Sequence, residues 1–519
     1  MAKEPGQKTQ RYPIDYFEGV NATVSHNIAK PTELYHMENA RSPVIGVLEK
    51  RQGQEEFGLG SDGESLISAG NFGLYYFPND GDNSGLYRIS KVAGVVSVFV
   101  LGNDDIWYQL SDADANSLSE FNFSFSNVDS NLVFVNQNDT NRMILEDGNT
   151  VITSTDVGSL FNSPKAMLTS FYKNRIYLGD FIRNGVEYKT TVIRSSFPMG
   201  IVALANGDVT AATGPVWTIP VTDAKYFYAD AGMNQYDIYR GATKIAVITV
   251  SEVHETSIDV LVADMVFEAG QSSILSADEI WVLGTYTGKK QYRWVNNPTK
   301  TGGDVKLYDT FKLSGGDEDA LTIMEPVGNV LILGNKHTMM SWNDYNLENF
   351  DLGVGCVSRH GYTKLLGTLY FIHYSGIFSM TGSAPQLISR KVERYIKGAS
   401  RAGLEGAAVG FKGLSIFFSI GDVNLYNDDG SFWKTLPDTC LEFHVADQDW
   451  YIHTNVSADD FESFVDSGGV QRLVMSDSVV ASAGVFGPEM IINGDFTGND
   501  DNWALDNGWT YGSNKVTKS

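Results

Sequence analysis

Short runs of apolar and aromatic residues dominate the chain, and within each run apolar and polar positions alternate with a period close to two. Phe72–Phe77 runs into the turn residues Pro78–Gly81. Val96–Leu101 runs in the same way into Gly102–Asp105. Alternating runs that end at Gly, Asn or Asp are typical of strands joined by tight hairpins, because these residues tolerate positive φ angles. The pattern therefore predicts an all-β protein with few helices.

Four segments share one arrangement, in which an aliphatic strand leads through a Gly or Asn turn into a second strand. They are Leu168–Gly179, Ile323–Gly334, Tyr362–Ile372 and, more weakly, Ala408–Phe418. Repeated units of about 40 residues, each a small antiparallel sheet, build a β-propeller because one blade cannot bury both of its faces alone. We therefore expect a β-propeller.

The repeat breaks down between about Gly200 and Pro298, where a separate series of strands occurs. Ile245–Val250 and Ile258–Val262 belong to this series. We interpret it as a small β-sandwich inserted between blades, because loop tips accept insertions most easily.

The end of the chain changes character again. Met490–Phe496, Trp503 and Trp509 are similar to the opening of carbohydrate-binding jelly-roll modules. About 30 residues cannot close a sandwich that normally takes about 100, so the segment is either an extension that docks on a neighbour or a glycan-binding element.

These boundaries predict five parts. They are an N-terminal arm with the first strands (1–60), a first set of blades (61–200), the inserted sandwich (201–300), a second set of blades (301–485) and a C-terminal extension (486–519).

The balance of charge excludes some partners. Lys and Arg total 38 against 63 Asp and Glu, which gives a formal net charge of −25. Such a surface repels phosphate backbones, so wrapping of nucleic acid is disfavoured. The first residues lack the apolar stretch of a signal peptide, and no later run is long and apolar enough to span a bilayer. We expect a soluble chain with no membrane contact, folded in the cytoplasm where it is made.

Motifs for catalysis or metal binding do not stand out. None of the eight histidines forms a His-Glu-x-x-His pattern, and no nucleophile elbow or Walker loop occurs. His337, His360 and His373 fall in or beside predicted strands, where a structural role is expected. Cys356 and Cys440 are interpreted as buried free thiols. The sequence thus predicts no cofactor, no metal and no enzymatic activity.

Two acidic segments partly match known motifs. Asp112, Asp114 and Asn116 copy the first ligand positions of a calcium loop, but Ser117 stands where the sharp turn needs Gly and Phe123 where the bidentate Glu belongs. We therefore expect a solvated turn.

The segment Asp428–Trp433 partly matches the Asp box of sialidase-type propellers. That box is a hairpin device even in enzymes, so here it supports a blade rather than catalysis.

One constellation is more specific. Pro31–Pro43 leads through Val47–Gly53, which resembles the opening of tail hub or nozzle proteins of short-tailed bacteriophages, also called packaged-DNA stabilisation proteins. In that family an extended arm runs into a Glu-x-Arg-x-Gly turn. Further segments match in order: Phe171–Gly179, Val327–Gly334, Trp342, Gly353–His360, Leu369–Ile372, Gly376–Phe378 and Ile388–Ile396. The insertion around Ala205–Pro298 and the end after Met490 depart from the family pattern.

The resemblance implies a virion structural protein, located in the tail and assembled in the host cytoplasm. It implies a propeller in a ring of identical subunits, as a hexamer, that extends the portal and adaptor channel, retains packaged DNA and passes it on ejection. Its partners would be other copies of itself, the portal or adaptor proteins, tail fibres or a tail needle, and double-stranded DNA in transit.

Two sets of candidate residues follow from this reading. The acidic loops at Asp104, Asp105, Asp317, Glu318 and Asp319 are candidates for facing the channel, where strong positive sites would slow the sliding duplex. Aromatic residues near turns are candidates for the contacts between subunits, although burial within a blade is the alternative for each of them. They are Tyr75, Tyr76, Trp107, Tyr108, Trp450 and Tyr451.

Two other functions stay open at this point. One is a glycan-binding tail adhesin or fibre-attachment protein, which needs exposed aromatic residues on a shallow surface. The other is a propeller glycosidase or lyase, which needs two carboxylates across a cleft.

Overall fold

The structure is a computed structural model in which the chain forms two compact units. Unit 1 comprises Met1–Pro78, Asp82–Gln109 and Val327–Ser519, and unit 2 comprises Asn79–Gly81 and Leu110–Pro326. The described residues are 38, 40–44, 47–50, 54–56, 59–60, 71–78, 83–156, 159–183, 185–230, 232–286, 290–294, 310–313, 319–350, 353–427, 429–466, 468–476, 484–486, 509–512 and 515–518. Among them, no helix has the length and apolar character needed to cross a membrane.

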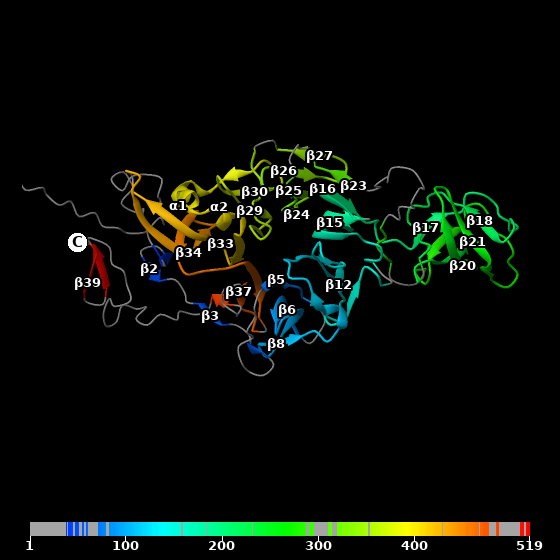
Figure 1. The fold of residues 1–519 in the computed structure, drawn as a ribbon, viewed down its shortest axis with the longest axis horizontal. Helices are drawn as coiled ribbons and strands as arrows, with labels where there is room; N and C mark the ends of the chain where they lie inside the picture. Colours follow the sequence, from blue (N-terminus) through cyan, green and yellow to red (C-terminus); the bar gives the residue numbers. More distant parts are fainter. Residues whose placement is uncertain are drawn as a thin grey trace, which may run out of the picture. The chain divides into compact units, whose positions relative to one another are not determined.

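Unit 1 is built from antiparallel meanders, in which consecutive strands pair as neighbours (Figure 1). The first sheet has the order β4 (Leu59–Gly60), β8 (Ile106–Gln109), β7 (Val95–Gly102), β6 (Asn83–Val92) and β5 (Asn71–Tyr76), with β4 parallel to β8. The next sheet contains β25 (Val330–Gly334), β26 (Met339–Trp342) and β27 (Leu347–Asn349). The sheet after it consists of β28 (Tyr362–Leu365), β29 (Thr368–His373), β30 (Gly376–Met380) and β31 (Gln386–Leu387). A further sheet consists of β32 (Ala408–Lys412), β33 (Ser415–Tyr426), β34 (Phe432–His444) and β35 (Asp449–His453).

The last sheet of unit 1 combines one strand from the N-terminal part of the chain with three strands from the C-terminal part. Its order is β36 (Asp460–Val465), β37 (Gln471–Ser476), β38 (Gly484–Phe486) and then β3 (Gln54–Glu56) from the N-terminal part. Gln54 pairs with Phe486, and Glu56 pairs with Gly484. Two separate hairpins are β1 (Ala40–Val44) with β2 (Val47–Lys50), and β39 (Trp509–Gly512) with β40 (Lys515–Lys518).

In the part of the chain that the structure describes, helix is confined to short pieces. In unit 1 they are η2 (Ser389–Val392), α1 (Glu393–Gly398) and α2 (Arg401–Glu405). Ser400 caps α2 by accepting a hydrogen bond from the Gly403 backbone N–H. This caps one of the free N–H groups at the start of the helix.

Unit 2 contains two further meanders. It begins with η1 (Ala113–Ala115) and β9 (Asn116–Leu118). One sheet has the order β10 (Ser124–Val128), β11 (Asn131–Val135), β12 (Arg142–Ile144) and β13 (Val151–Thr153), and the other has β14 (Lys165–Tyr172), β15 (Arg175–Arg183), β16 (Val186–Arg194) and β23 (Thr310–Lys312). Strand β24 (Ile323–Val327) carries the chain out of this unit.

Successive four-stranded antiparallel meanders are the blades of a β-propeller, so the predicted fold is confirmed. The four repeated segments are the first hairpins of their sheets: β14–β15, β24–β25, β28–β29 and β32–β33. Two of them turn on residues with positive φ, at Lys173 and Asn174 (47° and 55°) and at Leu366 and Gly367 (51° and 76°). Such two-residue turns match the right-handed twist of the flanking strands.

A separate series of strands lies in the region expected for the insertion, but its place in the chain differs from the expectation. Its strands lie between β16 and β23, which are the third and fourth strands of one sheet, so the insertion interrupts a blade rather than separating two blades. A connection between paired strands is a loop like any other, and loops accept insertions as long as their ends stay close.

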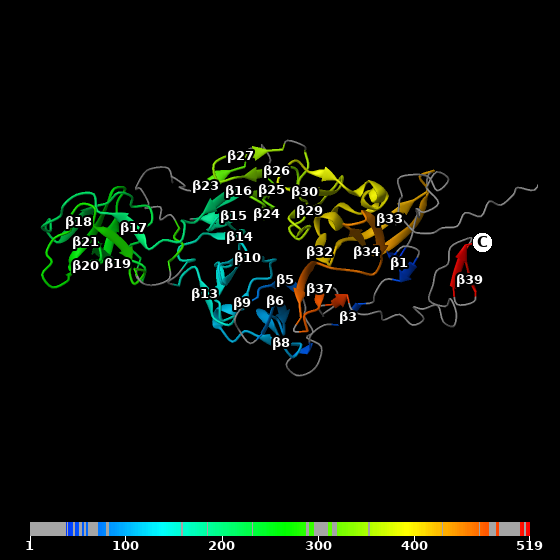
Figure 2. The ribbon, with the colours of Figure 1, turned by 180° about the vertical axis from the view of Figure 1, so that it is seen from behind.

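The inserted strands form one continuous six-stranded sheet (Figure 2). Its order is β17 (Ile201–Leu204), β22 (Glu279–Val282), β19 (Gln235–Arg240), β20 (Thr243–Val253), β21 (Ser257–Phe267) and β18 (Val216–Pro220). Ala205 bridges to Val221, so the chain just beyond the two edge strands is paired as well. The sheet is therefore bent back on itself around a core that includes Phe227, Ile248 and Ile280.

Parts of the N- and C-terminal predictions lie outside the described residues. The Glu49-x-Arg51-x-Gly53 turn ends in residues 51–53, and most of the 486–519 extension, with the jelly-roll-like opening, falls in residues 487–508.

Gly410 tests the close approach between two sheets of unit 1. A Cβ atom at this position would lie 2.4 Å from Phe461 Cβ on β36. We expect Gly410→Ala to lower the free energy of unfolding by about 1–3 kcal/mol, because the neighbouring backbone must shift. Urea denaturation measures this.

The matched control is Gly468→Ala, where the new Cβ would first meet Asp466 Oδ1 at 3.3 Å. This variant should stay within about 0.5 kcal/mol of the parent. Equal stability of the two variants would contradict the tight packing at Gly410.

Candidate functional site

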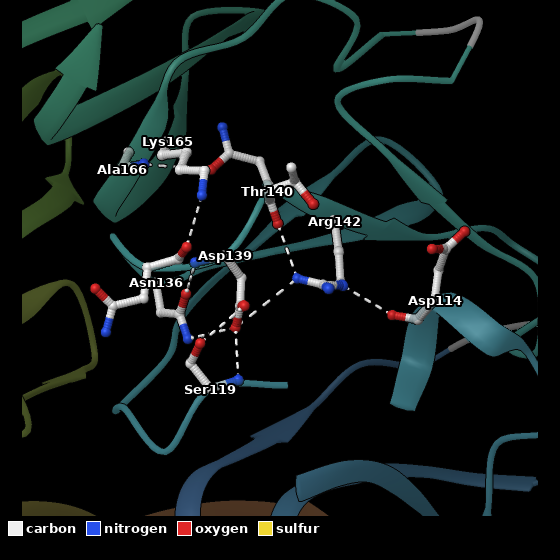
Figure 3. A network of polar contacts seen from close by, with 10 residues as sticks. Asp114, Ser119, Asn136, Asp139, Thr140, Arg142, Lys165 and Ala166 are labelled. Carbon is white, nitrogen blue, oxygen red and sulfur yellow. Dashed lines mark hydrogen bonds and ion pairs between the residues drawn. The ribbon is translucent and has the colours of Figure 1, made fainter. Parts of the chain in front are cut away.

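A polar network in unit 2 joins η1 and the segment after β9 to strand β12 and the turn that precedes it (Figure 3). The Asp139 carboxylate accepts hydrogen bonds from the backbone N–H and the hydroxyl of Ser119, both at 2.9 Å. Arg142 donates to the carbonyl oxygens of Asp114 (2.7 Å) and Thr140 (2.9 Å). Burial lowers the pKa of the Arg142 guanidinium. These groups bind one another and the backbone, so the network stabilises the conformation of these segments.

The calcium-like motif is part of the same region. Asp112 caps η1, with Oδ1 accepting from the Asp114 N–H (2.9 Å) and Oδ2 accepting from the Val151 N–H (3.0 Å). The Asn116 amide donates to the carbonyl oxygens of Leu110 and Asp112. Burial, with the charges of Asp156 and Asp112, raises the pKa of Asp114. The carboxylate oxygens of Asp112 are thus already used by backbone donors, as expected for a turn.

A buried Ser–Glu–His cluster lies in the β33–β35 sheet of unit 1. The Ser415 hydroxyl donates to Glu442 Oε1 at 2.6 Å, and His453 Nε2 lies 2.7 Å from Glu442 Oε2. The side chains of His453 and Glu442 are 1% and 3% exposed. In a catalytic triad the imidazole lies between hydroxyl and carboxylate. Here the carboxylate lies between the other two, so the imidazole does not contact the serine hydroxyl and the cluster lacks the order of a triad.

His360 forms a second His–carboxylate pair in unit 1. Its Nδ1 lies 3.2 Å from Asp460 Oδ1, while Asp460 Oδ2 accepts the Leu74 N–H. Burial acts to lower the pKa of His360, but the charge of Asp460 and the hydrogen bond to it act together in the other direction, and the net shift is upward. Burial and the Asp460 charge also raise the pKa of Glu462 well above its usual range. The pair links β36 to β5 through Leu74 and so stabilises unit 1.

His373, at the end of β29, is a neutral buried histidine. The Ser375 backbone N–H donates to its Nδ1 (3.2 Å), which places the proton of the neutral ring on Nε2. Burial, with the nearby His337, lowers the pKa of His373 to about 4.

The adjacent Tyr374 hydroxyl donates a hydrogen bond to Glu405, and hydrogen bonds from Tyr374 and Arg401 lower the pKa of Glu405 to about 2.

The predicted acidic loops are placed only in part. Asp104 and Asp105 lie exposed in the turn between β7 and β8. The Tyr108 hydroxyl donates to Asp104 at 2.7 Å, and this bond lowers the pKa of Asp104. Asp319 is partly buried, and Asp317 and Glu318 lie outside the described residues. The channel-facing role of these residues remains a prediction.

The predicted interface aromatics divide into two groups. Trp107, Trp450 and Tyr451 are buried in the core of unit 1, so their assignment to a surface contact is wrong. Tyr75 and Tyr76 are partly buried, and Tyr108 is exposed. Alternate residues of a strand face opposite sides, so the buried Trp107 leaves its neighbour Tyr108 on the outer side.

An exposed aromatic pair was missed by the sequence reasoning. Tyr426 and Phe432 are cross-strand partners at the tip of the β33–β34 hairpin, 51% and 58% exposed. Their rings meet edge to face with centroids 6.1 Å apart. The sequence does contain a signal for this pair, since aromatic residues stand on both sides of the turn Asn427–Ser431.

Among the described residues, the one group of three side chains that could hold a metal ion is Glu252, His254 and Asp259.

Comparisons with known proteins give distant structural similarity alone. No family model matches the chain, and no curated protein matches it. Among solved structures, Sqt1 of Saccharomyces cerevisiae has 8% identity and a TM-score of 0.31, covering 84% of this chain and 100% of Sqt1. BamB of Moraxella catarrhalis has 9% identity and a TM-score of 0.30, covering 84% of this chain and 99% of BamB. YCF48 bound to D1 peptide has 6% identity and a TM-score of 0.32, covering 87% and 99%. No function is transferred from such distant similarity.

The depressed pKa of His373 predicts acid sensitivity. An unfolded histidine takes up a proton near pH 6.5, whereas the folded one does so near pH 4. The stability contributed by the neutral ring is therefore complete above about pH 6.5 and is lost as the pH falls toward 4. We expect the parent to lose up to about 3 kcal/mol more than His373→Gln over this range. Urea titrations at several pH values measure the difference, and parallel pH profiles would contradict it.

Proposed function

We propose that the chain is a phage virion structural protein, a subunit of the tail nozzle or hub ring. In this role, identical propellers form a ring that extends the portal and adaptor channel, retains packaged DNA and passes it on ejection. The proposal is about architecture and passage rather than catalysis.

The observation that carries the proposal is the place of the resembling segments in the fold. Phe171–Gly179 spans the β14–β15 turn, and Leu369–Ile372 with Gly376–Phe378 forms β29 and β30. Ile388–Ile396 runs through η2 into α1. Two of these motifs thus lie in the hairpins of blades and the third lies in the helical segment that follows a blade, and these positions support the proposal.

The charge of the chain adds support. The net charge is −25, and acidic residues such as Asp104, Asp105 and Asp429 stand exposed in hairpin turns. An acidic channel wall holds no strong sites for phosphate, so a duplex can slide past it.

Ring formation predicts a contact between copies of the chain, and the exposed pair Tyr426 and Phe432 offers an aromatic surface for it. We expect Tyr426→Ser with Phe432→Ser to weaken self-association at least about tenfold, because hot spots of interfaces are enriched in aromatic residues. Sedimentation velocity over a concentration series measures this, with circular dichroism as the check on folding.

Tyr345→Ser is the matched control. Tyr345 is 84% exposed in the turn after β26, and loss of a lone exposed ring should leave association unchanged. Association that is equally strong in the double variant would exclude this hairpin as the contact. A parent chain that stays monomeric both in solution and in particles would contradict the ring.

The acidic surface predicts weak binding to DNA. In a gel shift at about 50 mM salt, duplex DNA should not bind more tightly than about the micromolar range, because like charges repel within a Debye length. Tight binding that weakens as salt is added would contradict the low-friction channel and indicate a plug that grips DNA.

A further inference from the structure

Three potential metal ligands converge on one face of the β20–β21 hairpin in the inserted sheet. Glu252 and Asp259 are direct cross-strand partners. His254 follows Glu252 by two positions, and its backbone N–H donates to the Ser257 carbonyl at 2.8 Å, which closes the turn. Residues two apart on a strand share a face, and cross-strand partners share it too. The fold therefore brings all three side chains together.

The distances are short enough for one ion. His254 Nε2 lies within hydrogen-bonding distance of Asp259 Oδ2, at 3.1 Å, and His254 Nδ1 lies 4.0 Å from Glu252 Oε1. An ion would bind one of these two ring nitrogens and displace the hydrogen bond. One ligand atom from each of the three residues lies within 4.8 Å of the others. Ligand atoms around a single ion bound at about 2.0–2.2 Å lie at most about 4.4 Å apart, so small rotations of these side chains would bring all three into range.

Apart from His254, the two carboxylates of this cluster have no basic partner among the described residues. Two carboxylates directly opposite each other on paired strands repel and destabilise a hairpin. In the described part of the chain, no Lys or Arg forms an ion pair with Glu252 or Asp259. A bound cation would turn this repulsion into attraction.

Asp259 supplies an independent indication. Its Oδ1 atom is buried and has no hydrogen-bond partner among the described residues. A buried carboxylate oxygen without a hydrogen-bond donor lowers the stability of the fold, and such an oxygen indicates that an ion or a water molecule binds there. The other two ligands are more open, since the side chains of His254 and Glu252 are 41% and 69% exposed.

We propose that Glu252, His254 and Asp259 bind a divalent transition-metal ion of the zinc type. The imidazole favours zinc and its neighbours over calcium and magnesium, which take oxygen ligands. Three protein ligands leave at least one position for water or for a donor from another molecule. The ion would hold the turn of the β20–β21 hairpin, and the proposal is independent of the ring function.

The spacing explains why sequence motifs did not reveal this site. The order Glu252-x-His254-x4-Asp259 matches no helical two-histidine pattern, and the ligands meet through the pairing of two strands. The expectation that the chain binds no metal rested on the absence of closely spaced motifs.

The test uses the full chain, stripped with a chelator and then titrated with Zn²⁺ by isothermal calorimetry. We expect one site of about micromolar affinity or better that is weakened at least tenfold in both His254→Ala and Asp259→Asn. Glu252→Gln, which changes an exposed group, should also weaken it and keeps the test valid if another variant fails to fold. Co²⁺ in place of Zn²⁺ should give a visible absorption band that these variants lose.

The matched control is His444→Ala. His444 Nδ1 lies 2.7 Å from Asp447 Oδ2, and among the described residues this pair has no third ligand. Its loss should leave zinc affinity and stoichiometry unchanged. The proposal is overturned if the parent binds no zinc, if the three site variants bind it as tightly as the parent, or if Ca²⁺ and Mg²⁺ bind as tightly as Zn²⁺.

Discussion

Strands that are buried on both faces impose the main constraint on this fold. Strand β35 is buried along its whole length, and β33 is buried over its first half. A sheet with two apolar faces must be covered on both sides, and one meander cannot do this alone. The core clusters of unit 1 accordingly draw on more than one sheet. One joins Phe417 and Cys440 to Phe461, and another joins Trp107 to Phe464.

The inserted sheet solves the same problem in a different way. It bends so that a single sheet encloses its own core, which includes Tyr236, Ile258 and Val260. Since it buries its apolar face within itself, it needs no cover from a blade. This explains how a blade can hold such an insertion between its third and fourth strands and still complete its sheet with β23.

Local features of the fold could be predicted from the sequence, and long-range features could not. The hairpin turns at Lys173–Asn174 and Leu366–Gly367 carry a local signal in residues that adopt positive φ. The pairing of β3 with β38 and of β16 with β23 joins strands far apart in the sequence, so no local pattern announces it.

The same limit applies to the candidate sites. The contact of Glu442 with His453 and the convergence of Glu252 and Asp259 depend on strand register, which sequence spacing does not reveal. The sequence left both a subunit contact and burial open for Trp107, because an aromatic residue beside a turn can face either side of its strand, and the structure shows that it is buried. Tyr108, the next residue, is the one that the strand leaves exposed.

The central claim is that many copies of this chain form a ring on the exit path of a packaged genome. Electron cryomicroscopy of intact particles made by the genome that encodes the chain tests it most directly, with an antibody fragment against the inserted sheet as the marker. The account predicts several fragments arranged with rotational symmetry around the channel at the tail. A single fragment per particle, a position away from the channel or no marked particles at all would contradict it.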